Sequence, residues 1–256
     1  MRKTLKTILA AGVAGSLLFG AASAGAAESF TAAQKEELGQ IIKQYLLENP
    51  EILDEAMSAL EKKRADQAQA QQSRTIAEKA SLLLNSPRQV VLGNPKGDVT
   101  VVEFFDYNCG YCKRAMPDML ALLEQDKNLR FVLKEFPVLG QGSVEAAHVA
   151  TAVNKLAPEK YLDFHKKLLS ARGEANKARA MEAAVAVGLD AAKIEAEMKS
   201  AEVQASLEEG FGLANGLGLT GTPSYVIGQQ VIPGAIGMPK LKDRIAEVRG
   251  CLPKQC

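Results

Sequence analysis

Apolar positions near the start of the chain follow a helical period. Within residues 28–48 they form one stripe, made of Leu38, Ile41, Ile42, Tyr45 and Leu46. Asn49 and Pro50 mark the start of a second helix, because asparagine caps helices well and proline is accepted at the first helical position. This helix carries its own stripe, made of Leu53, Ala56, Met57 and Leu60. The pattern therefore predicts two short amphipathic helices in succession.

The segment after Leu60 is polar. From Glu61 to Thr75 no apolar side chain is larger than alanine, and glutamine, alanine and charged residues dominate. This composition is typical of either a solvated helix or a flexible connector, and the pattern does not choose between them. Two short helices on a polar tether have little apolar surface of their own to pack against. They either fold back on the main domain or associate with copies of themselves.

After Pro87 the pattern changes to alternating strands and helices. Residues 99–105 (VTVVEFF) predict a buried strand, because β-branched and aromatic side chains dominate. A helix is expected from Cys109 to about Gln125, followed by a strand over 129–136 (LRFVLKEF). Strand, helix and strand with short joints predict a parallel pair with a crossover between them. Residues 90–92 predict one further short strand.

An alanine-rich stretch at residues 143–215 interrupts this alternation. It has helical periodicity and no convincing strand, so we expect a helical insertion there. Two strands, over 224–227 and 230–232, then flank a tight turn at Gly228. A closing helix is expected over 238–248. The whole pattern predicts an α/β fold.

The composition excludes several functions. A chain of 256 residues with 47% hydrophobic and 24% charged residues is typical of a globular protein. Its formal net charge of +1 provides no strong basic field, so a nucleic-acid partner is not expected. Only two histidines are present, His148 and His165, which argues against a multi-histidine metal centre. Both fall on helical faces shared with apolar residues and are expected to pack rather than to catalyse.

Residues 1–26 have the features of a secretory signal peptide. Arg2, Lys3 and Lys6 precede an apolar core at residues 8–19, and small residues suitable for cleavage surround Ala24. A membrane anchor is the less favoured alternative, because the apolar run is shorter than the ~20 residues that a spanning helix needs. The mature protein is therefore expected in an exported compartment where disulfides form.

The strongest chemical signal is Cys109-Gly110-Tyr111-Cys112, which follows a buried strand and opens a helix. A thiolate at a helix N-terminus faces unpaired N–H groups and the positive end of the helix dipole. This environment lowers the pKa of Cys109 and makes it the attacking sulfur, while Cys112 can resolve a mixed disulfide. The alternatives are a permanent disulfide and a zinc site shared with Cys251 and Cys256.

Two further features complete the set of candidate residues. Pro223 precedes a strand, so the Thr222-Pro223 bond can be a cis peptide that leaves the backbone of Thr222 open to an extended substrate. Cys251 and Cys256 lie past the last helix, and a short disulfide that fixes the C-terminus is the preferred interpretation. A second redox pair or a metal-capture pair is the alternative, without a supporting motif.

These motifs together resemble a known family. The CxxC motif on a first helix, Pro117 five residues after it, and Thr222-Pro223 before a hairpin resemble the thioredoxin fold. The helical insertion is similar to that of the Dsb class of bacterial periplasmic thiol–disulfide oxidoreductases. The run EFFDYNCGYC resembles the active-site strand of that class, and the similarity covers about residues 87–250. The expected fold is thus a thioredoxin fold with an inserted helical domain.

The resemblance also implies roles for two charged residues. Glu103 occupies the position of an acidic residue six before the first cysteine, and Lys134 matches the lysine that partners it. A buried carboxylate has a raised pKa and can exchange a proton with Cys112 during resolution. Lys134 would offset its charge. The alternative for Glu103 is an edge residue that faces water.

The subclass follows from residues near the cysteines and from the N-terminus. Gly110-Tyr111 and Thr222 resemble disulfide isomerases more than the strong oxidase, which has Pro-His and Val there. The N-terminal helices with a polar tether resemble the suppressor-of-copper-sensitivity protein C group, whose members trimerise through this segment and have isomerase activity. The implied organisation is a signal peptide (1–26), a helical oligomerisation segment (27–60), a polar helical linker (61–86), the catalytic domain (87–250) and a tail (251–256).

The predicted function is therefore that of a periplasmic disulfide isomerase or reductase. It needs no cofactor beyond its dithiol. Its expected partners are misfolded or disulfide-bearing exported proteins, a membrane thiol reductase that recycles it, and copies of itself, with a trimer favoured through residues 30–60. One alternative is a DsbA-like oxidase that introduces disulfides. The other is an exported protein that binds copper or zinc through its cysteines.

Overall fold

The structure is a computed structural model that describes residues 30–251. The chain divides into two compact units, Met1–Ala59 and Leu60–Cys256. The expected signal peptide lies outside the described residues. No helix within the described range is both long and apolar enough to cross a lipid bilayer.

The first unit contains α1 (Ala32–Glu48) and the beginning of α2 (Glu51–Glu78). Thr31 and Gln34 form a capping box that satisfies backbone N–H groups at the start of α1. At the other end of α1, the backbone N–H of Asn49 donates to the carbonyl of Tyr45. The two helices expected from the periodic pattern are therefore present. None of the residues of α1 is buried.

The polar segment between the N-terminal helices and the predicted main domain is helical, because α2 continues without a break through residues 61–75. The expected linker, however, ends earlier than residue 86. Thr75 and Ile76 near the end of α2 are buried, and so is Leu83 in α3 (Ala80–Asn85). Ile76 and Leu83 pack into a hydrophobic cluster of the second unit. The core of the second unit therefore includes apolar side chains that lie up to about a dozen residues before Pro87.

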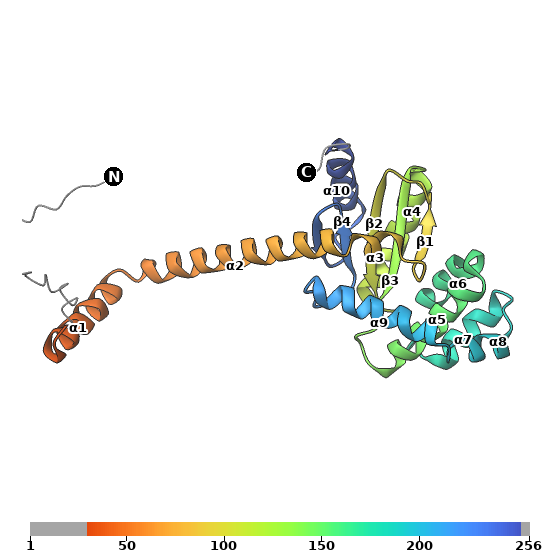
Figure 1. Ribbon diagram of the computed structural model, residues 1–256, viewed down its shortest axis with the longest axis horizontal. Coiled ribbons are helices and arrows are strands. Elements are labelled where there is room, and N and C mark those ends of the chain that lie inside the picture. The colour runs from red at the N-terminus through yellow and green to blue at the C-terminus, as the bar shows by residue number, and fades with distance from the viewer. Residues whose placement is uncertain (1–29, 252–256) are drawn as a thin grey trace, which may run out of the picture. The chain divides into compact units, whose positions relative to one another are not determined.

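The second unit is built on a five-stranded mixed sheet with the order β1-β3-β2-β4-β5 (Figure 1). Its strands are β1 (Val90–Gly93), β2 (Val99–Phe105), β3 (Leu129–Glu135), β4 (Ser224–Ile227) and β5 (Gln230–Pro233). The pairing of β2 with β3 is parallel and the other pairings are antiparallel. The helix α4 (Gly110–Gln125) connects β2 to β3, so the predicted parallel unit is confirmed.

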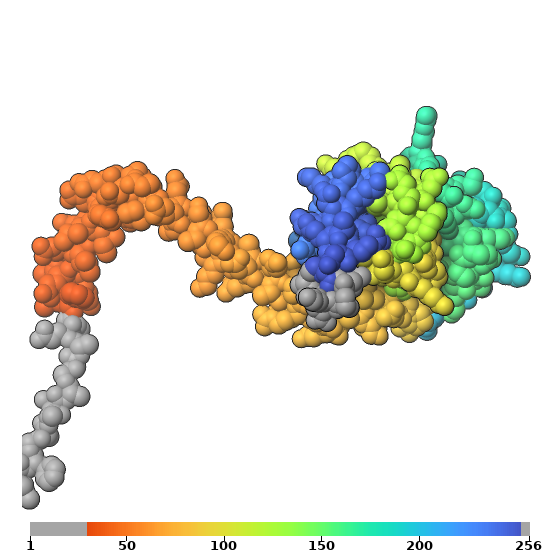
Figure 2. All heavy atoms as spheres, turned by 90° about the horizontal axis from the view of Figure 1, so that it is seen from above, coloured from red at the N-terminus to blue at the C-terminus, as the bar shows by residue number. Residues whose placement is uncertain are grey.

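The predicted helical insertion is also present. It consists of α5 (Gln141–Leu156), α6 (Pro158–Ser170), α7 (Lys177–Ala186), α8 (Ala191–Glu197) and α9 (Ala201–Gly216), and α10 (Met238–Cys251) closes the fold. The helices α5 to α8, coloured green to cyan, gather at one side of this unit (Figure 1, Figure 2). Alanines of α5 such as Ala146 and Ala150 are completely buried, because small side chains let neighbouring helices approach closely.

Alternation of side chains along β2 and β3 places two hydrophobic cores on opposite faces of the sheet. Val101, Phe105 and Phe131 belong to the first core, which α4, α10 and the insertion helices cover. Val102 and Phe104 belong to the second, which α3 and α9 cover. Burial of each such side chain contributes about 1.5–3 kcal/mol to folding. The two faces matter for the site, because Glu103 of β2 lies on the first face and Lys134 of β3 lies on the second.

Candidate active site

Cys109 lies at the N-terminus of α4, directly beyond the end of β2. It is the N-cap of that helix, and its sulfur accepts a hydrogen bond from the backbone N–H of Cys112 at 3.4 Å. Hydrogen bonding from Cys112 is the main cause that lowers the pKa of Cys109 to about 5, and Thr222 and nearby backbone N–H groups add to it. Burial acts in the opposite direction. Cys109 is therefore a thiolate at neutral pH.

Cys112 lies one turn further along α4, and both cysteines are in the reduced form. Only 2% of its surface is exposed. The hydrogen bond with Cys109 raises the pKa of Cys112, and burial and the negative charge of Glu103 raise it further. The two sulfurs thus have opposite electrostatic environments: Cys109 is ionised, whereas Cys112 keeps its proton.

Glu103 lies in the middle of β2 and is buried on the same face of the sheet as Phe105. Burial raises its pKa to about 8, with a smaller contribution from the charge of Cys109. A carboxyl group with this pKa can both accept and release a proton near neutral pH. Glu103 is therefore buried rather than an edge residue that faces water, while its role toward Cys112 stays a prediction.

The expected partnership between Lys134 and Glu103 is wrong. The register of β2 and β3 pairs Glu103 with Leu133, and Phe104 with Lys134. Since side chains alternate along a strand, Lys134 points to the opposite face of the sheet from Glu103. Its Nζ donates to Glu209 of α9 at 2.9 Å and to the carbonyl of Leu82 at 2.7 Å. Lys134 therefore connects α3, β3 and α9 rather than tuning the active site.

The Thr222-Pro223 peptide bond is cis, as the motif predicted. It precedes β4, which pairs with β2 so that Tyr225 lies opposite Glu103. This pairing brings Thr222 next to the first cysteine, and Sγ of Cys109 lies 3.1 Å from the carbonyl oxygen of Thr222, to which it donates only in its protonated form. The backbone of Thr222 is therefore in position to meet any peptide that approaches Cys109.

The two residues between the cysteines face outward. The Tyr111 side chain is 60% exposed, and the guanidinium of Arg114 lies over its ring at 4.2 Å from the centroid. A methyl group added at Gly110 would meet only the side chain of Arg114, at 3.8 Å. Both positions are accessible to a protein substrate.

Sequence reasoning missed Asp106 and Asn108, which hold the loop before Cys109. Asp106 is completely buried and accepts four hydrogen bonds of 2.7–3.0 Å, from the backbone N–H groups of Asn108, Val138 and Leu139 and from the hydroxyl of Ser143. The side-chain amide of Asn108 bonds both the N–H and the carbonyl of Ala175. Two polar residues directly after a buried strand are the signal that could have identified them.

The remaining sequence candidates lie away from this centre. Cys251 ends α10 and takes part in a disulfide, while its expected partner Cys256 lies outside the described residues, so that pairing remains a prediction. His165 is buried beside the hydroxyl of Tyr107, and burial lowers its pKa to about 3. Nδ1 of His148 lies 2.8 Å from the carbonyl of Val144. Both histidines thus pack in the helical region, as expected.

The fold and the dithiol define the class of protein, and comparison with known proteins agrees. The family described as DSBA-like thioredoxin domain matches residues 100–246, and the N-terminal domain of the copper resistance protein ScsC matches residues 34–67. The disulfide bond formation protein D of Bacillus subtilis (strain 168) is 28% identical over 178 residues, which are 63% of this chain and 78% of that protein.

Two solved structures extend the comparison. A thioredoxin-like oxidoreductase from Silicibacter pomeroyi DSS-3 is 42% identical, with a TM-score of 0.64 over 66% of this chain and 97% of that one. Proteus mirabilis ScsC in a transitional conformation is 31% identical, with a TM-score of 0.63 over 86% of this chain and 96% of that one. The chain belongs to the family of DSBA-like thioredoxin domains and is a thiol–disulfide oxidoreductase of the DsbA and ScsC type.

Proposed function

We propose that this protein is a disulfide isomerase or reductase of the bacterial periplasm, exported by the signal sequence in residues 1–26. The observation that carries the proposal is the coexistence of two features in one chain. One is a thiol pair with an ionised Cys109 and a protonated Cys112. The other is an N-terminal helix, within the ScsC-like segment, whose apolar side chains are exposed.

The chemistry starts at Cys109. Its thiolate attacks a client disulfide, so that a mixed disulfide forms and a client thiolate leaves. In isomerisation, the freed client thiolate attacks another client disulfide and expels a different client thiolate. A client thiolate finally attacks the client sulfur of the mixed disulfide, so that a new client disulfide forms and Cys109 leaves as a thiolate. Because its pKa is about 5, Cys109 is a good leaving group in this step.

Reduction uses the second cysteine. When Glu103 is ionised, which is the minor form at neutral pH because its pKa is about 8, Cys112 gives it a proton and attacks the sulfur of Cys109 in the mixed disulfide. The client leaves as a thiolate and the Cys109–Cys112 disulfide forms. A membrane thiol reductase then has to supply two electrons to restore the dithiol. Thr222 and Pro223 hold the client backbone beside Cys109, and the exposed Gly110-Tyr111 pair contacts the client.

The first unit supports assembly into an oligomer, with a trimer favoured. Along α1, Leu38, Ile41, Ile42 and Tyr45 are between 42% and 57% exposed, although they form the apolar stripe of that helix. A short helix with an exposed apolar stripe is marginal in water unless another surface covers it. Copies of the same helix are suited to cover it, and several active sites on one assembly raise the effective concentration for a client with several wrong disulfides.

The test is the recovery of activity from a protein with scrambled disulfides in a glutathione buffer. The mature chain is compared with an Ile41→Asp/Ile42→Asp variant, because both positions are exposed and a charge there should block assembly without unfolding the domain. A Gln40→Asp variant on the polar side of the same helix is the control. We expect the double variant to be monomeric and to lose isomerase activity, while the control keeps both properties. A monomeric variant with full isomerase activity would contradict the proposal.

A dithiol oxidase is the second candidate function, and the low pKa of Cys109 favours it. A stable thiolate leaves a mixed disulfide readily, so the oxidised form passes its disulfide to reduced clients. The same wild-type and double-variant proteins distinguish the two functions. If both only oxidise a reduced client and neither reshuffles wrong disulfides, the protein is an oxidase.

A further inference from the structure

The loop between β3 and α5, residues 136–140, carries two apolar side chains that face solvent. Phe136 and Pro137 are buried, whereas Val138 and Leu139 directly after them are 42% and 53% exposed. We call Val138 and Leu139 the apolar pair. Single exposed apolar side chains are common on protein surfaces and need no explanation. The apolar pair differs from them, because a buried carboxylate holds its backbone.

The backbone N–H groups of the apolar pair donate to one oxygen, Oδ2 of Asp106, at 2.9 and 3.0 Å. Asp106 is completely buried. The burial of a carboxylate costs free energy, which hydrogen bonds to the charged form offset. Two of the four hydrogen bonds that Asp106 accepts therefore fix the backbone of two residues whose own side chains stay exposed.

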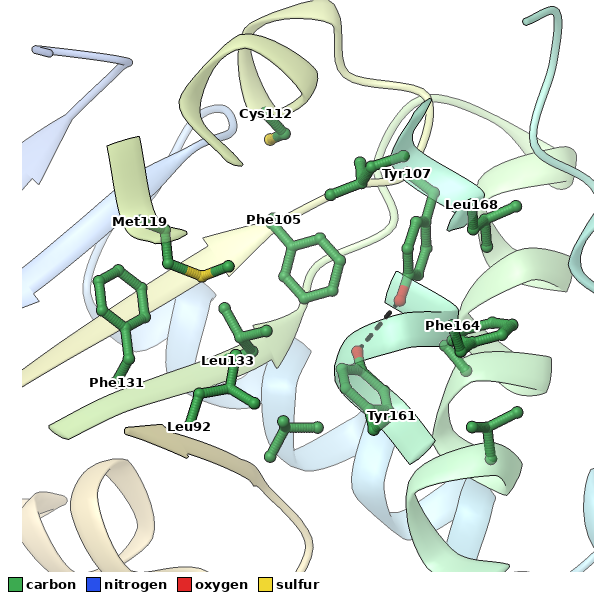
Figure 3. Close-up of a cluster of buried hydrophobic side chains, with 14 of the residues drawn as sticks. Leu92, Phe105, Tyr107, Cys112, Met119, Phe131, Leu133, Tyr161, Phe164 and Leu168 are labelled. Atoms are coloured by element: carbon green, nitrogen blue, oxygen red, sulfur yellow. Dashed lines mark hydrogen bonds between the residues drawn. The ribbon is translucent and has the colours of Figure 1, made fainter. Parts of the chain in front are cut away.

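The backbone of Asp106 also belongs to the active site. Its carbonyl accepts from the N–H of Cys109 at 3.1 Å, and its backbone hydrogen-bonds the sulfur of Cys112. The next residue, Tyr107, anchors this stretch in the first core. Tyr107 is 1% exposed, and Figure 3 shows its hydroxyl pointing toward Tyr161. Asp106 therefore ties the apolar pair to the same anchored segment that contacts both cysteines.

The sheet places the apolar pair and the cis-proline loop on two sides of Cys109. β2 lies between β3 and β4. Because β3 is parallel to β2 and β4 is antiparallel, β3 ends and β4 begins at the edge where β2 ends. Thr222 meets Cys109 from the side of β4, and the apolar pair is bonded to Asp106 from the side of β3. A client that is joined to Cys109 by a mixed disulfide therefore has both loops beside it.

We propose that Val138 and Leu139 form a second client contact, which takes an apolar side chain next to the client cysteine, and that Asp106 is the positioning residue that holds this contact beside Cys109. The proposal rests on the attack of Cys109 on client disulfides in the proposed function. Misfolded clients expose apolar side chains, and the side chains of the apolar pair offer no hydrogen-bonding group. A loop that is fixed in advance loses less conformational entropy when a client binds.

The two contacts differ in what they recognise. Thr222 presents backbone groups, and every client can form hydrogen bonds with these regardless of its sequence. The apolar pair contacts side chains, so it favours some clients over others. A preference for apolar residues around the client cysteine should therefore depend on the apolar pair and on Asp106.

The test compares two peptides that differ only beside their single cysteine, which leucines flank in one and serines in the other. Each peptide carries one tryptophan, and its cysteine forms a disulfide with a nitrobenzoate thiol. The Cys109 thiolate attacks the peptide sulfur, and the coloured nitrobenzoate thiolate that leaves gives the rate of attack. Later release of the peptide by Cys112 is visible in the tryptophan fluorescence, because the chain itself has no tryptophan.

The quantity measured is the ratio of the attack rates on the leucine and serine peptides at low peptide concentration. This ratio cancels any general change in the reactivity of Cys109, and the same ratio for glutathione, which has no such surface, is the reference. We expect the ratio for the wild type to exceed that for glutathione by about tenfold, which corresponds to partial burial of one or two apolar side chains.

Variants of the apolar pair assign the preference to this surface. Val138→Ser and Leu139→Ser should each lower the ratio, and the double variant should bring it to that of glutathione. Val185→Ser is the matched control, because Val185 is 51% exposed and lies at the end of α7, away from the loop that bonds Asn108. It should keep the wild-type ratio. A loss of preference in Val185→Ser as large as in Leu139→Ser would overturn the proposal.

Two measurements address Asp106. An amide at this position has one accepting oxygen and cannot accept all four hydrogen bonds, so Asp106→Asn should lower the ratio as the serine variants do. Hydrogen exchange of the intact wild-type protein is independent of whether this variant folds. The amides of Val138 and Leu139 should be protected, because a buried carboxylate holds them. Exchange at the rate of an unstructured peptide, or full preference in a folded Asp106→Asn protein, would overturn the role of Asp106.

The remaining outcomes separate the inference from the function on which it rests. If the wild type attacks both peptides with the ratio of glutathione, or if the double variant keeps the wild-type ratio, the second client contact is overturned. The attack by Cys109 then still stands. If the wild type attacks neither peptide, Cys109 is not the nucleophile, and the proposed function fails together with the inference.

Discussion

On one face of the sheet the buried Lys134 forms an ion pair with Glu209, whereas on the other face the carboxyl groups of Glu103 and Glu135 form no ion pair among the described residues. Lys134 and Glu209 lie 2.9 Å apart under α3, with Arg88 and Ser86 as further partners of the same carboxylate. On the opposite face, burial raises the pKa of both Glu103 and Glu135. A paired charge holds elements together, whereas a carboxyl group with a raised pKa can carry a proton. The face with Lys134 and Glu209 therefore stabilises the fold, whereas the face with Glu103 and Glu135 is suited to proton transfer.

Removal of the lysine from the paired face should have the largest effect on stability. Lys134→Met leaves Glu209 buried with fewer partners, so we expect a loss of about 3 kcal/mol in the free energy of unfolding. Urea unfolding of the reduced protein measures this loss. The rate at which Cys109 attacks a disulfide should not change, because Lys134 lies on the other face.

A double variant makes this first prediction sharper. Lys134→Met with Glu209→Met replaces the whole pair by apolar side chains and should recover most of the lost stability. If Lys134→Met instead slows resolution by Cys112 as strongly as a change at Glu103 does, the separation of the two faces is wrong.

Removal of the carboxylate from the unpaired face should affect rate more than stability. Glu103→Gln keeps the shape but cannot take the proton of Cys112, so resolution should slow by about a hundredfold. Peptide release measured by fluorescence gives this rate. The free energy of unfolding should stay the same or rise at alkaline pH, since an ionised buried group is no longer present. A destabilised Glu103→Gln protein with normal resolution would contradict the comparison.

The pH dependence of stability should carry opposite contributions from Glu103 and Cys109. In the folded state Glu103 keeps its proton up to about pH 8, against about 4.3 in the unfolded chain, so its contribution makes stability fall as pH rises between these values. Cys109 has a lowered pKa of about 5, against ~8.5 unfolded, so its contribution makes stability rise with pH over that window. Between pH 5 and pH 8, the Glu103→Gln protein should therefore gain more stability than the wild type. Urea unfolding of the two reduced proteins measures this difference. If the free energy of unfolding changes equally in both proteins between pH 5 and pH 8, Glu103 does not titrate as its burial implies.

The smallest effect is expected from the hydroxyl of Ser86 on the paired face. It donates to Glu209 at 2.9 Å and accepts from the backbone N–H of Arg88 at 3.1 Å, and Lys134 and Arg88 remain as partners of Glu209 when it is removed. Ser86→Ala should therefore cost about 2 kcal/mol in the free energy of unfolding, about 1 kcal/mol for each hydrogen bond. A loss as large as that of Lys134→Met would mean that Glu209 depends on the hydroxyl more than on the lysine.

Local patterns account for the parts that could be predicted. The strand at 99–105, the helix after Cys109 and the helical insertion follow from periodicity within single segments, and the CxxC and Thr222-Pro223 motifs follow from adjacent residues. Lys134 and Glu209, in contrast, are 75 residues apart, and Asp106 bonds Ser143 across 37 residues. A pattern within one segment of the sequence does not show which residues will be partners across such distances along the chain.

The sequence by itself indicated most of the helices and strands, named Cys109 as the candidate attacking thiol and allowed a cis bond before Pro223, because each depends on neighbours within one turn or one strand. The tertiary structure decided which buried charges are paired. A one-residue difference in register separates Lys134 from Glu103, because successive side chains of a strand point to opposite faces. It also decided that the core of the second unit reaches back before Pro87, since Ile76 and Leu83 are core residues only after α9 and the sheet come together.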